Sequence, residues 1–191
     1  MRTIRALFPL LLLAVAVPQV QAQTPAPAAA PAAAPTPPPP GFRAEILGQF
    51  NLSMAKFLAL AGAMPEDKYA WSPGEGVHSV RRVYIHVARY NYNYPEMSMG
   101  VAAPAGFTAD SLDAAVMTKE QVIDFLRTSR EHVRTVIANV SDEQLARPTD
   151  LYGRQVPQWE VLMQLVAHMN EHLGQSIAYA RINGVKPPWT Q

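Results

Sequence analysis

Helical periodicity is the feature that most constrains the fold of this chain. Four long stretches carry apolar side chains three and four residues apart, a spacing that lines one face of an α-helix. The sequence has no internal repeat and no convincing pair of strands. We therefore predict an all-α fold, a four-helix bundle. The helices are expected over about 42–64, 79–94, 118–139 and 157–182.

Capping and breaking residues define the ends of these helices. Ser79 can cap the second helix, which we expect to end at Tyr94 because a proline follows it. The sequence "TKEQ", which begins at Thr118, matches a capping box and opens the third helix. Pro157 suits the first position of the fourth helix.

Three connecting segments complete the predicted domain. Residues 96–117 are weakly patterned and long enough to cross the length of a bundle, so the second and third helices can run parallel. The predicted bundle therefore has a long crossover connection between helices 2 and 3. "SDEQ" at 141–144 repeats the capping signature and predicts one short helical turn. Residues 150–156 are expected to form a loop.

The first 40 positions are not expected to join this domain. Residues 1–22 are typical of a secretory signal peptide, because Arg2 and Arg5 precede an apolar run that ends in a small-residue cleavage site. Residues 23–40 are nearly all proline and alanine, so they cannot bury a core and predict a disordered linker. The folded domain is then 41–191, and the protein is expected to be periplasmic or secreted.

Charge and cysteine content exclude several classes of function. Without Arg2 and Arg5, the 16 basic side chains become 14 against 15 acidic ones, a formal charge of −1. A near-neutral domain has no electrostatic footprint for nucleic acid or anionic lipid. The absence of cysteine excludes disulfides, thiolate metal ligands and a cysteine nucleophile. We therefore expect no nucleic-acid partner and no stable membrane anchor after processing.

Three histidines lie at the margins of the apolar helix faces. His168 and His172 are four residues apart, so they share one side of the fourth helix, beside its apolar face. His86 occupies the same marginal position on the second helix. If these margins face each other, the three imidazoles converge between two helices and can bind one metal ion. His78 and His132 are expected to be ordinary polar residues.

A histidine pair of this spacing has an alternative interpretation. Two histidines four apart can also be hydrogen-bonded residues at the edge of a bundle, and for the pair alone this is about as common as a metal site. The third histidine at a core margin favours the metal site.

Three segments resemble signatures of the DinB-like (DinB/YfiT) superfamily, and the resemblance spans residues 41–188. They are "WSPGEGVHSVRRVYIHV", "HMNEHLGQ" and "ARINGVKPPW", in that order. The family pattern has a Trp-x-Pro loop, a histidine in helix 2, an H-x-x-x-H-x-G-Q segment in helix 4 and a terminal R-x-x-G-x-x-P-P. The matching residues are Trp71, Pro73, His86, His168, His172, Gly174, Gln175, Arg181, Gly184, Pro187 and Pro188.

The resemblance implies a four-helix bundle with a crossover connection and a divalent metal held by His86, His168 and His172. Leu173 departs from the family, since many members carry arginine there, so no anion-binding role is carried over. Some relatives transfer low-molecular-weight thiols or isomerise thiol adducts, which are cytosolic substrates, so an exported relative is expected to act on something else. Family members often form dimers, so a homodimer is an expected partner beside an unidentified small molecule.

The ligand set indicates which metal and which chemistry to expect. Three neutral imidazoles without a thiolate favour Zn²⁺ or Ni²⁺, with Fe or Mn also suited. Three protein ligands leave one coordination position open, as in catalytic rather than structural zinc sites. Tyr90, Asn93 and Gln175 lie near enough on their helices to support the ligands.

Three hypotheses of function follow. The first is a metal-dependent enzyme of unknown substrate, although the sequence identifies no catalytic acid or base. The second is a non-catalytic metal or small-ligand binding bundle in the periplasm. The third is a purely structural interaction bundle, in which Trp71, Trp159 and Trp189 are core or loop anchors.

Overall fold

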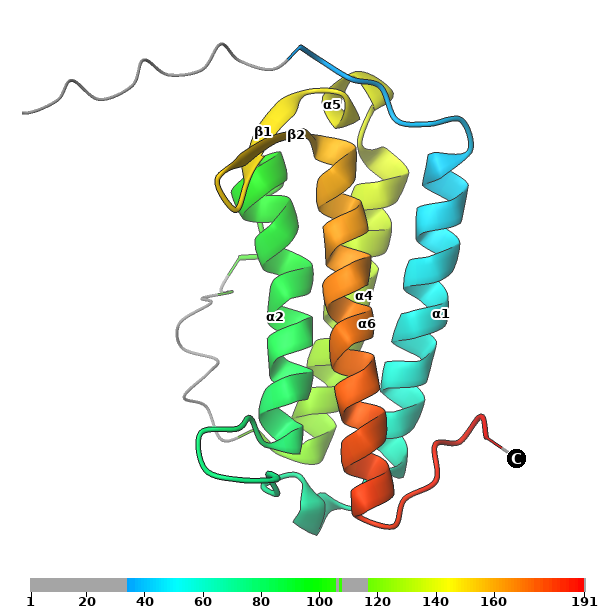
Figure 1. The fold of residues 1–191 in the computed structure, drawn as a ribbon, viewed down its shortest axis with the longest axis vertical. Helices are drawn as coiled ribbons and strands as arrows, with labels where there is room; N and C mark the ends of the chain where they lie inside the picture. The colour runs from blue at the N-terminus through cyan, green and yellow to red at the C-terminus, as the bar shows by residue number, and fades with distance from the viewer. Residues whose placement is uncertain (1–33, 106, 108–116, 191) are drawn as a thin grey trace, which may run out of the picture. The chain divides into compact units, whose positions relative to one another are not determined.

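The computed structural model describes residues 34–105, 107 and 117–190, and these form a bundle of four long helices (Figure 1). The helices are α1 (Phe42–Ala63), α2 (Val80–Met99), α4 (Lys119–Asn139) and α6 (Gln158–Ile182). Both α1 and α2 pack against α4 and α6, so the four helices surround one core. The predicted four-helix bundle is confirmed.

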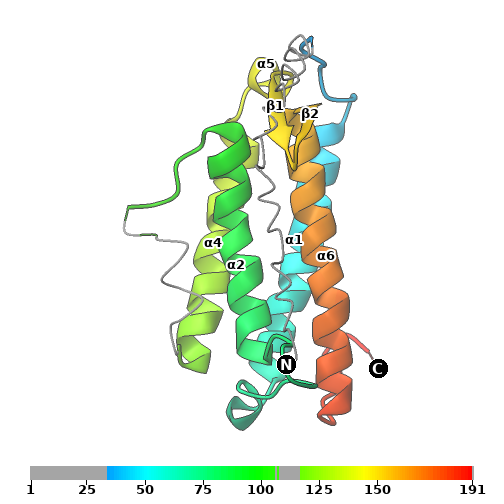
Figure 2. The ribbon, with the colours of Figure 1, turned by 60° about the vertical axis from the view of Figure 1, so that its left-hand side comes forward.

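The helices of this bundle do not simply alternate in direction. Figures 1 and 2 show α2 and α4 running one way and α1 and α6 the other. The start of α4 lies at the end of α1, where the Lys119 ammonium donates to the carbonyls of Gly62 and Met64. The ends of α2 and α4 lie together, since Gln144, just after α4, donates to the Met99 carbonyl. The crossover itself includes residues outside the described part, so its path stays a prediction.

The N-terminal predictions fall mostly on residues that the structure does not describe. The signal peptide at 1–22 and the greater part of the linker at 23–40 lie outside the described residues. The described end of the linker, residues 34–40, has no helix or strand. The Thr36 amide donates to the Ala146 carbonyl, and the Thr36 carbonyl accepts from the Trp159 indole at 3.1 Å. Trp159 is therefore an anchor at this end of the bundle.

Burial of apolar side chains stabilises the bundle. Each fully buried large side chain contributes about 1.5–3 kcal/mol relative to an exposed one. By length and composition alone α1 could cross a membrane, but its apolar face forms one wall of this core. Fully buried members of the core include Phe50, Phe57, Leu60, Leu126, Leu162 and Leu165.

The predicted helix starts are largely confirmed. The Ser79 hydroxyl accepts from the amide of the third residue of α2, and Thr118 with Gln121 completes the capping box of α4. The short helix α5 (Asp142–Leu145) begins after its Ser141 cap, as the sequence predicts. Pro157 is the N-cap of α6 rather than its first helical residue, a shift of one position.

The predicted end of the second helix is wrong, because α2 continues through Pro95 to Met99. Proline has no N–H, so the helix loses one backbone hydrogen bond at this position. The additional turn buries Tyr94, Pro95 and Met99. Gly100, with φ 69°, ends the helix and donates to the Pro95 carbonyl. Burial of these side chains outweighs the missing hydrogen bond.

The predicted loop at 150–156 is also wrong, because this region contains a β-hairpin. The strands β1 (Pro148–Leu151) and β2 (Arg154–Pro157) pair antiparallel across a two-residue turn. Tyr152 and Gly153 in that turn have φ of 55° and 76°, as a type I′ turn requires. Tyr-Gly is not one of the usual Asn-Gly or Asp-Gly pairs, so the sequence carried only a weak turn signal.

The hairpin is fastened to both long helices of the predicted site. The Thr149 hydroxyl donates to the Ser98 carbonyl at the end of α2, with an O···O distance of 2.6 Å. Both strands also contact α6, which follows directly from β2. The hairpin therefore lies across the end of α2 and the start of α6 at one end of the bundle (Figure 1).

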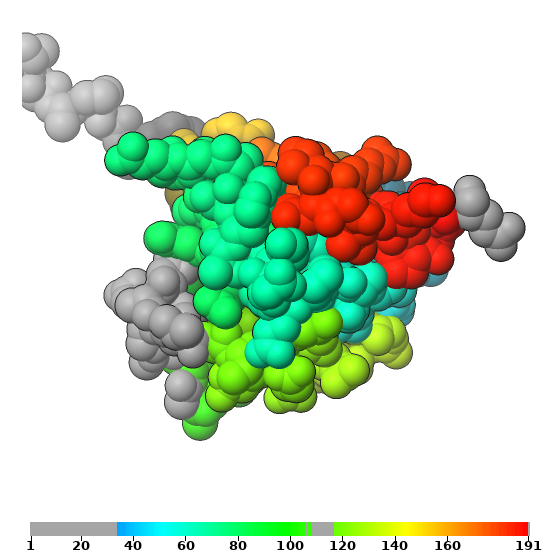
Figure 3. Space-filling model, turned by 90° about the horizontal axis from the view of Figure 1, so that it is seen from below, coloured from blue at the N-terminus to red at the C-terminus, as the bar shows by residue number. Residues whose placement is uncertain are grey.

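The opposite end of the bundle is covered by two other segments. Viewed from below, Figure 3 shows residues between α1 and α2 beside the segment that follows α6. The Trp71 ring packs edge-on against Tyr179 of α6 at 5.3 Å, and Trp189 packs on the core. The expectation that these tryptophans are core or loop anchors agrees with their positions.

A matched pair of substitutions tests the core. Leu60 is fully buried on α1 and Leu52 is 54% exposed on the same helix. We expect Leu60→Ala to lower the free energy of unfolding by about 2–5 kcal/mol, because it leaves a cavity. Leu52→Ala is expected to stay within about 0.5 kcal/mol of the wild type. Urea unfolding followed by circular dichroism measures both, and equal losses would contradict the assigned core.

Candidate metal centre

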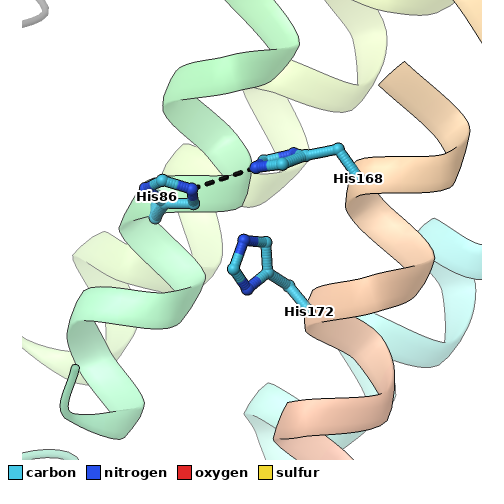
Figure 4. Close-up of side chains that lie close together, drawn as sticks. All are labelled: His86, His168 and His172. Carbon is cyan, nitrogen blue, oxygen red and sulfur yellow. Dashed lines mark hydrogen bonds between the residues drawn. The ribbon is translucent and has the colours of Figure 1, made fainter. Parts of the chain in front are cut away.

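The three predicted histidines come together between α2 and α6 (Figure 4). His86 belongs to α2, His168 and His172 belong to α6, and all three are half-buried. One ring nitrogen of each lies within 4.8 Å of the others. The Nε2 atoms of His86 and His168 are 3.0 Å apart. The structure thus brings together all three residues that the sequence singled out.

The antiparallel contact of α2 with α6 causes this convergence. Two residues four apart on α6 lie one above the other on the same side of the helix. His86 on α2 lies opposite them, with its ring centroid 5.0 Å from that of His168 and 4.7 Å from that of His172. Because the margins of both apolar faces meet here, the imidazoles are partly desolvated but still reachable from outside.

The donor set fits a divalent metal ion. Zinc–nitrogen bonds of about 2.0–2.1 Å in a tetrahedral site place two ligand nitrogens roughly 3.3 Å apart. The observed 3.0 Å between His86 and His168 lies close to that value, and His172 completes the set within 4.8 Å. In the metal-free contact one of the two Nε2 atoms must carry the proton and donate to the other. Metal binding requires that proton to move or leave.

Burial keeps two of these rings neutral. Desolvation, followed by the neighbouring His172 and His168, lowers the pKa of His86 from 6.5 to about 3. Desolvation, followed by His172, lowers the pKa of His168 from 6.5 to about 4. Neutral imidazole is the form that binds a metal, so at neutral pH neither ring has to lose a positive charge before it binds.

A chain of hydrogen bonds sets the orientation of His172. The Tyr179 hydroxyl donates to the His78 backbone carbonyl at 3.2 Å, because a carbonyl can only accept. The Tyr179 oxygen then accepts from Gln175 Nε2 at 2.8 Å. That arrangement turns Gln175 Oε1 toward His172 Nδ1, 2.8 Å away, which must donate. The proton of His172 is thereby held on Nδ1, and Nε2 keeps the lone pair that a metal needs.

The loop before α2 supports this chain. Trp71 packs against the Tyr179 ring, and the Trp71 carbonyl accepts from the first amide of α2. Trp71, in the loop before α2, and Gln175, on α6, therefore both help to orient His172: Gln175 contacts it directly, and Trp71 packs on the Tyr179 ring that holds Gln175. Sequence analysis placed Gln175 near the ligands, and the structure identifies its partner.

A wall of tyrosines borders the triad on its other side. The Tyr90 ring lies 4.6 Å from both the His86 and His168 rings, and Tyr94 lies 5.7 Å from His168. Beyond this wall is a pocket of about 320 Å³ between α2 and the hairpin. Its lining residues include Tyr90, Asn93, Tyr94, Met97, Asp150 and Tyr152. Tyr152 was missed by sequence analysis, because the hairpin that carries it was not predicted.

Of the two remaining histidines, His132 lies away from the triad and His78 lies beside it. His132 packs against Tyr92 at 4.9 Å and is not part of the triad, as predicted. His78 lies nearer the site than expected, with its ring 5.8 Å from that of His86 and its carbonyl in the Tyr179 contact. Leu173, at the family's arginine position, is buried in the core.

These features define a class: a helical bundle with a histidine triad between two of its helices and an adjoining pocket. A family model described as the DinB superfamily matches residues 49–178. The chain belongs to this superfamily, in agreement with the resemblance seen in its motifs. No curated protein sequence matches it significantly.

Solved structures of DinB-like proteins share the fold. A DinB-like protein from Bacillus cereus ATCC 10987 superposes with a TM-score of 0.66 at 19% identity, covering 76% of this chain and 95% of its own. YfiT from Bacillus subtilis superposes with a TM-score of 0.60 at 14% identity, covering 75% of this chain and 89% of its own. It is described as a probable metal-dependent hydrolase with an unusual four-helix bundle topology. A mutant mycothiol-dependent maleylpyruvate isomerase superposes with a TM-score of 0.58 at 14% sequence identity. The match covers 69% of this chain and 59% of the isomerase chain.

Loss of the Gln175 contact should weaken metal binding. Gln175→Leu removes the acceptor that holds the His172 proton on Nδ1, so we expect affinity for Zn²⁺ to fall about 10- to 100-fold. Isothermal titration of metal-free protein measures this change. Gln49→Leu, at an exposed position on α1, is the matched control and should bind as the wild type does. Equal affinities for both variants would contradict the assigned role.

The lowered pKa values predict how acid affects the metal-free domain. The unfolded chain takes up protons near pH 6.5, whereas the folded chain keeps His86 and His168 neutral to about 3 and 4. Stability is therefore expected to fall as the pH decreases below 6.5 and to change little above 7.

Urea unfolding in the presence of a chelator, at about pH 7.5 and about pH 5, measures this effect. The double variant His86→Gln/His168→Gln should lose less stability on acidification than the wild type. Some acid sensitivity should stay, because the variant retains His132 and burial lowers the pKa of that histidine as well. The assignment is wrong if the double variant is as acid-sensitive as the wild type.

Proposed function

We propose that this protein is an exported, metal-dependent enzyme that binds one divalent ion, Zn²⁺ or Ni²⁺, through His86, His168 and His172. One observation carries the proposal: ring nitrogens of these three residues, from two helices, lie within 4.8 Å of one another. Three imidazole ligands leave a coordination position for water or substrate, the pattern of catalytic sites.

The division of roles among the residues follows from their contacts. When bound, such an ion acts as a Lewis acid and lowers the pKa of a water molecule that it holds. His86 and His168 present neutral rings, and Gln175 keeps the His172 lone pair directed inward. Tyr90 separates the ligands from the pocket and limits access of bulk water to two of the rings.

A hydrolytic reaction on a small molecule is the activity we favour. YfiT is described as a probable metal-dependent hydrolase, and that likeness supports this reaction class. The pocket of about 320 Å³ beside the triad has the size of a small-molecule site. Thiol chemistry of the kind implied by the isomerase relative fits an exported protein less well, because low-molecular-weight thiols are cytosolic.

The proposed location outside the cytoplasm rests on the sequence. The apolar run after Arg2 and Arg5 and the cleavage signal before Gln23 support export. The Pro/Ala-rich segment would then separate the bundle from the membrane or from neighbouring proteins.

Metal analysis tests the proposal directly. Purified protein incubated with Zn²⁺ or Ni²⁺ and dialysed should retain about one ion per chain, measured by mass spectrometry of the elements. His86→Ala and His168→Ala should each lose nearly all of it, whereas His132→Ala should retain it because His132 lies outside the triad. A wild-type protein that retains no ion would overturn the metal site.

Catalysis needs a second measurement. Metal-loaded wild type and His168→Ala should be compared on a panel of neutral esters and amides, and hydrolysis should depend on His168. If metal binds but no substrate distinguishes the two proteins, the non-catalytic binding bundle becomes the better description.

A further inference from the structure

We infer that the pocket beside the triad binds a neutral carbonyl compound, an amide or an ester, whose oxygen accepts a hydrogen bond from the Tyr152 hydroxyl. The inference names the substrate class of the proposed enzyme and rests on that function. It also makes Tyr152, a residue of the hairpin turn, a specificity-determining residue.

The direction of hydrogen bonding around Tyr94 identifies the donor. Tyr152 is 66% exposed, so its proton can go to solvent or to a ligand, whereas Tyr94 is only 4% exposed. Tyr94 is buried, and among the contacts of the described residues its own proton has one acceptor, the Tyr152 hydroxyl oxygen, 2.5 Å away. Burial, together with this bond, raises the pKa of Tyr94, so its proton stays on at neutral pH. The Tyr152 oxygen is thus an acceptor from Tyr94, and its proton is available to a ligand.

The turn conformation is the second, independent observation. Tyr152 is a non-glycine residue with φ 55°, and it is 66% exposed. Asparagine or aspartate adopts this conformation at lower cost, and strain of this kind persists at functional sites. Most of the Tyr152 side chain stays exposed, and the turn brings its hydroxyl to Tyr94 at the pocket wall.

The charge of the pocket favours neutral ligands. Asp150 lines it, and its Oδ1 accepts from the Gly153 amide. None of the described residues that line the pocket is cationic. A carboxylate ligand would meet Asp150 without a compensating charge, whereas an amide can accept from Tyr152 and present its N–H groups to polar side chains. The tyrosine rings and Met97 offer apolar surface to the remainder of such a ligand.

The pocket and the triad share a wall, which connects binding to the reaction. Tyr90 lines the pocket and lies 4.6 Å from the rings of both His86 and His168. A carbonyl compound held by Tyr152 would therefore lie against Tyr90, one aromatic ring away from the His86 and His168 ligands.

Three probes of similar size test this inference: benzamide, which is neutral with a carbonyl acceptor; benzoate, which is anionic; and toluene, which has no acceptor. Their binding to metal-free full-length protein is measured by NMR titration. Benzamide should bind more tightly than toluene, and benzoate should bind most weakly. Equal binding of benzoate and benzamide, or no binding of benzamide up to its solubility limit, would overturn the inference.

Variants of the turn separate binding from folding. Tyr152→Phe should weaken benzamide binding about 5- to 10-fold and leave toluene binding unchanged, because only the hydroxyl is lost. Tyr152→Asn should lose benzamide binding while the protein keeps its native circular dichroism spectrum, since asparagine suits the turn. Tyr92→Phe, on the same helix as Tyr94 but outside the pocket, should bind all probes as the wild type does.

Unchanged benzamide affinity in Tyr152→Phe would show that Tyr152 is not the donor. The two proposals fail separately, because these titrations need no metal. Failure of metal binding would leave the probe preferences intact, and failure of the titrations would leave the metal stoichiometry intact.

Discussion

The antiparallel contact between α2 and α6 is the constraint on which the site depends. The apolar faces of both helices are buried in one core, so neither helix can rotate without exposing large side chains. That burial fixes which margins meet, and the margins carry His86 on one side and His168 with His172 on the other. The ligands are thus positioned by packing of residues that never touch the metal. Packing of the core therefore holds the three imidazoles together, although their partial burial lowers the pKa of His86 and His168 and keeps these rings neutral.

Elements at the two ends of the bundle refine what the helices provide. At one end, the loop before α2 anchors Tyr179, and through Gln175 it determines which nitrogen of His172 carries the proton. At the other end, the Tyr152 hydroxyl of the hairpin forms a hydrogen bond with the Tyr94 hydroxyl of α2, and the hairpin forms one wall of the pocket. The first network is directional, because it ends on the His78 carbonyl, which can only accept. The bundle supplies the ligands, and the ends supply orientation and access.

The helices were predictable because their signals are local. Periodicity, the caps at Ser79 and Thr118, and the short turn after Ser141 act within a few residues, so tertiary contacts had little to override. The two errors have non-local causes. Pro95 stays helical because its turn is buried, and the 148–157 segment forms a hairpin because α2 and α6 provide surfaces for it. The Tyr-Gly turn pair is too unusual to be read without those surfaces.

The sequence by itself determined the helical class, the family motifs and the three histidines at the core margins. It could do so because helical periodicity assigns each side chain a direction relative to the apolar face. Only the tertiary structure decided that these margins face each other, that Gln175 rather than another nearby polar residue orients His172, and that Tyr152 joins the pocket. Those relations link residues as many as 101 positions apart, as in the contact of Tyr179 with His78. No local pattern encodes such a distance, because it depends on how whole helices pack.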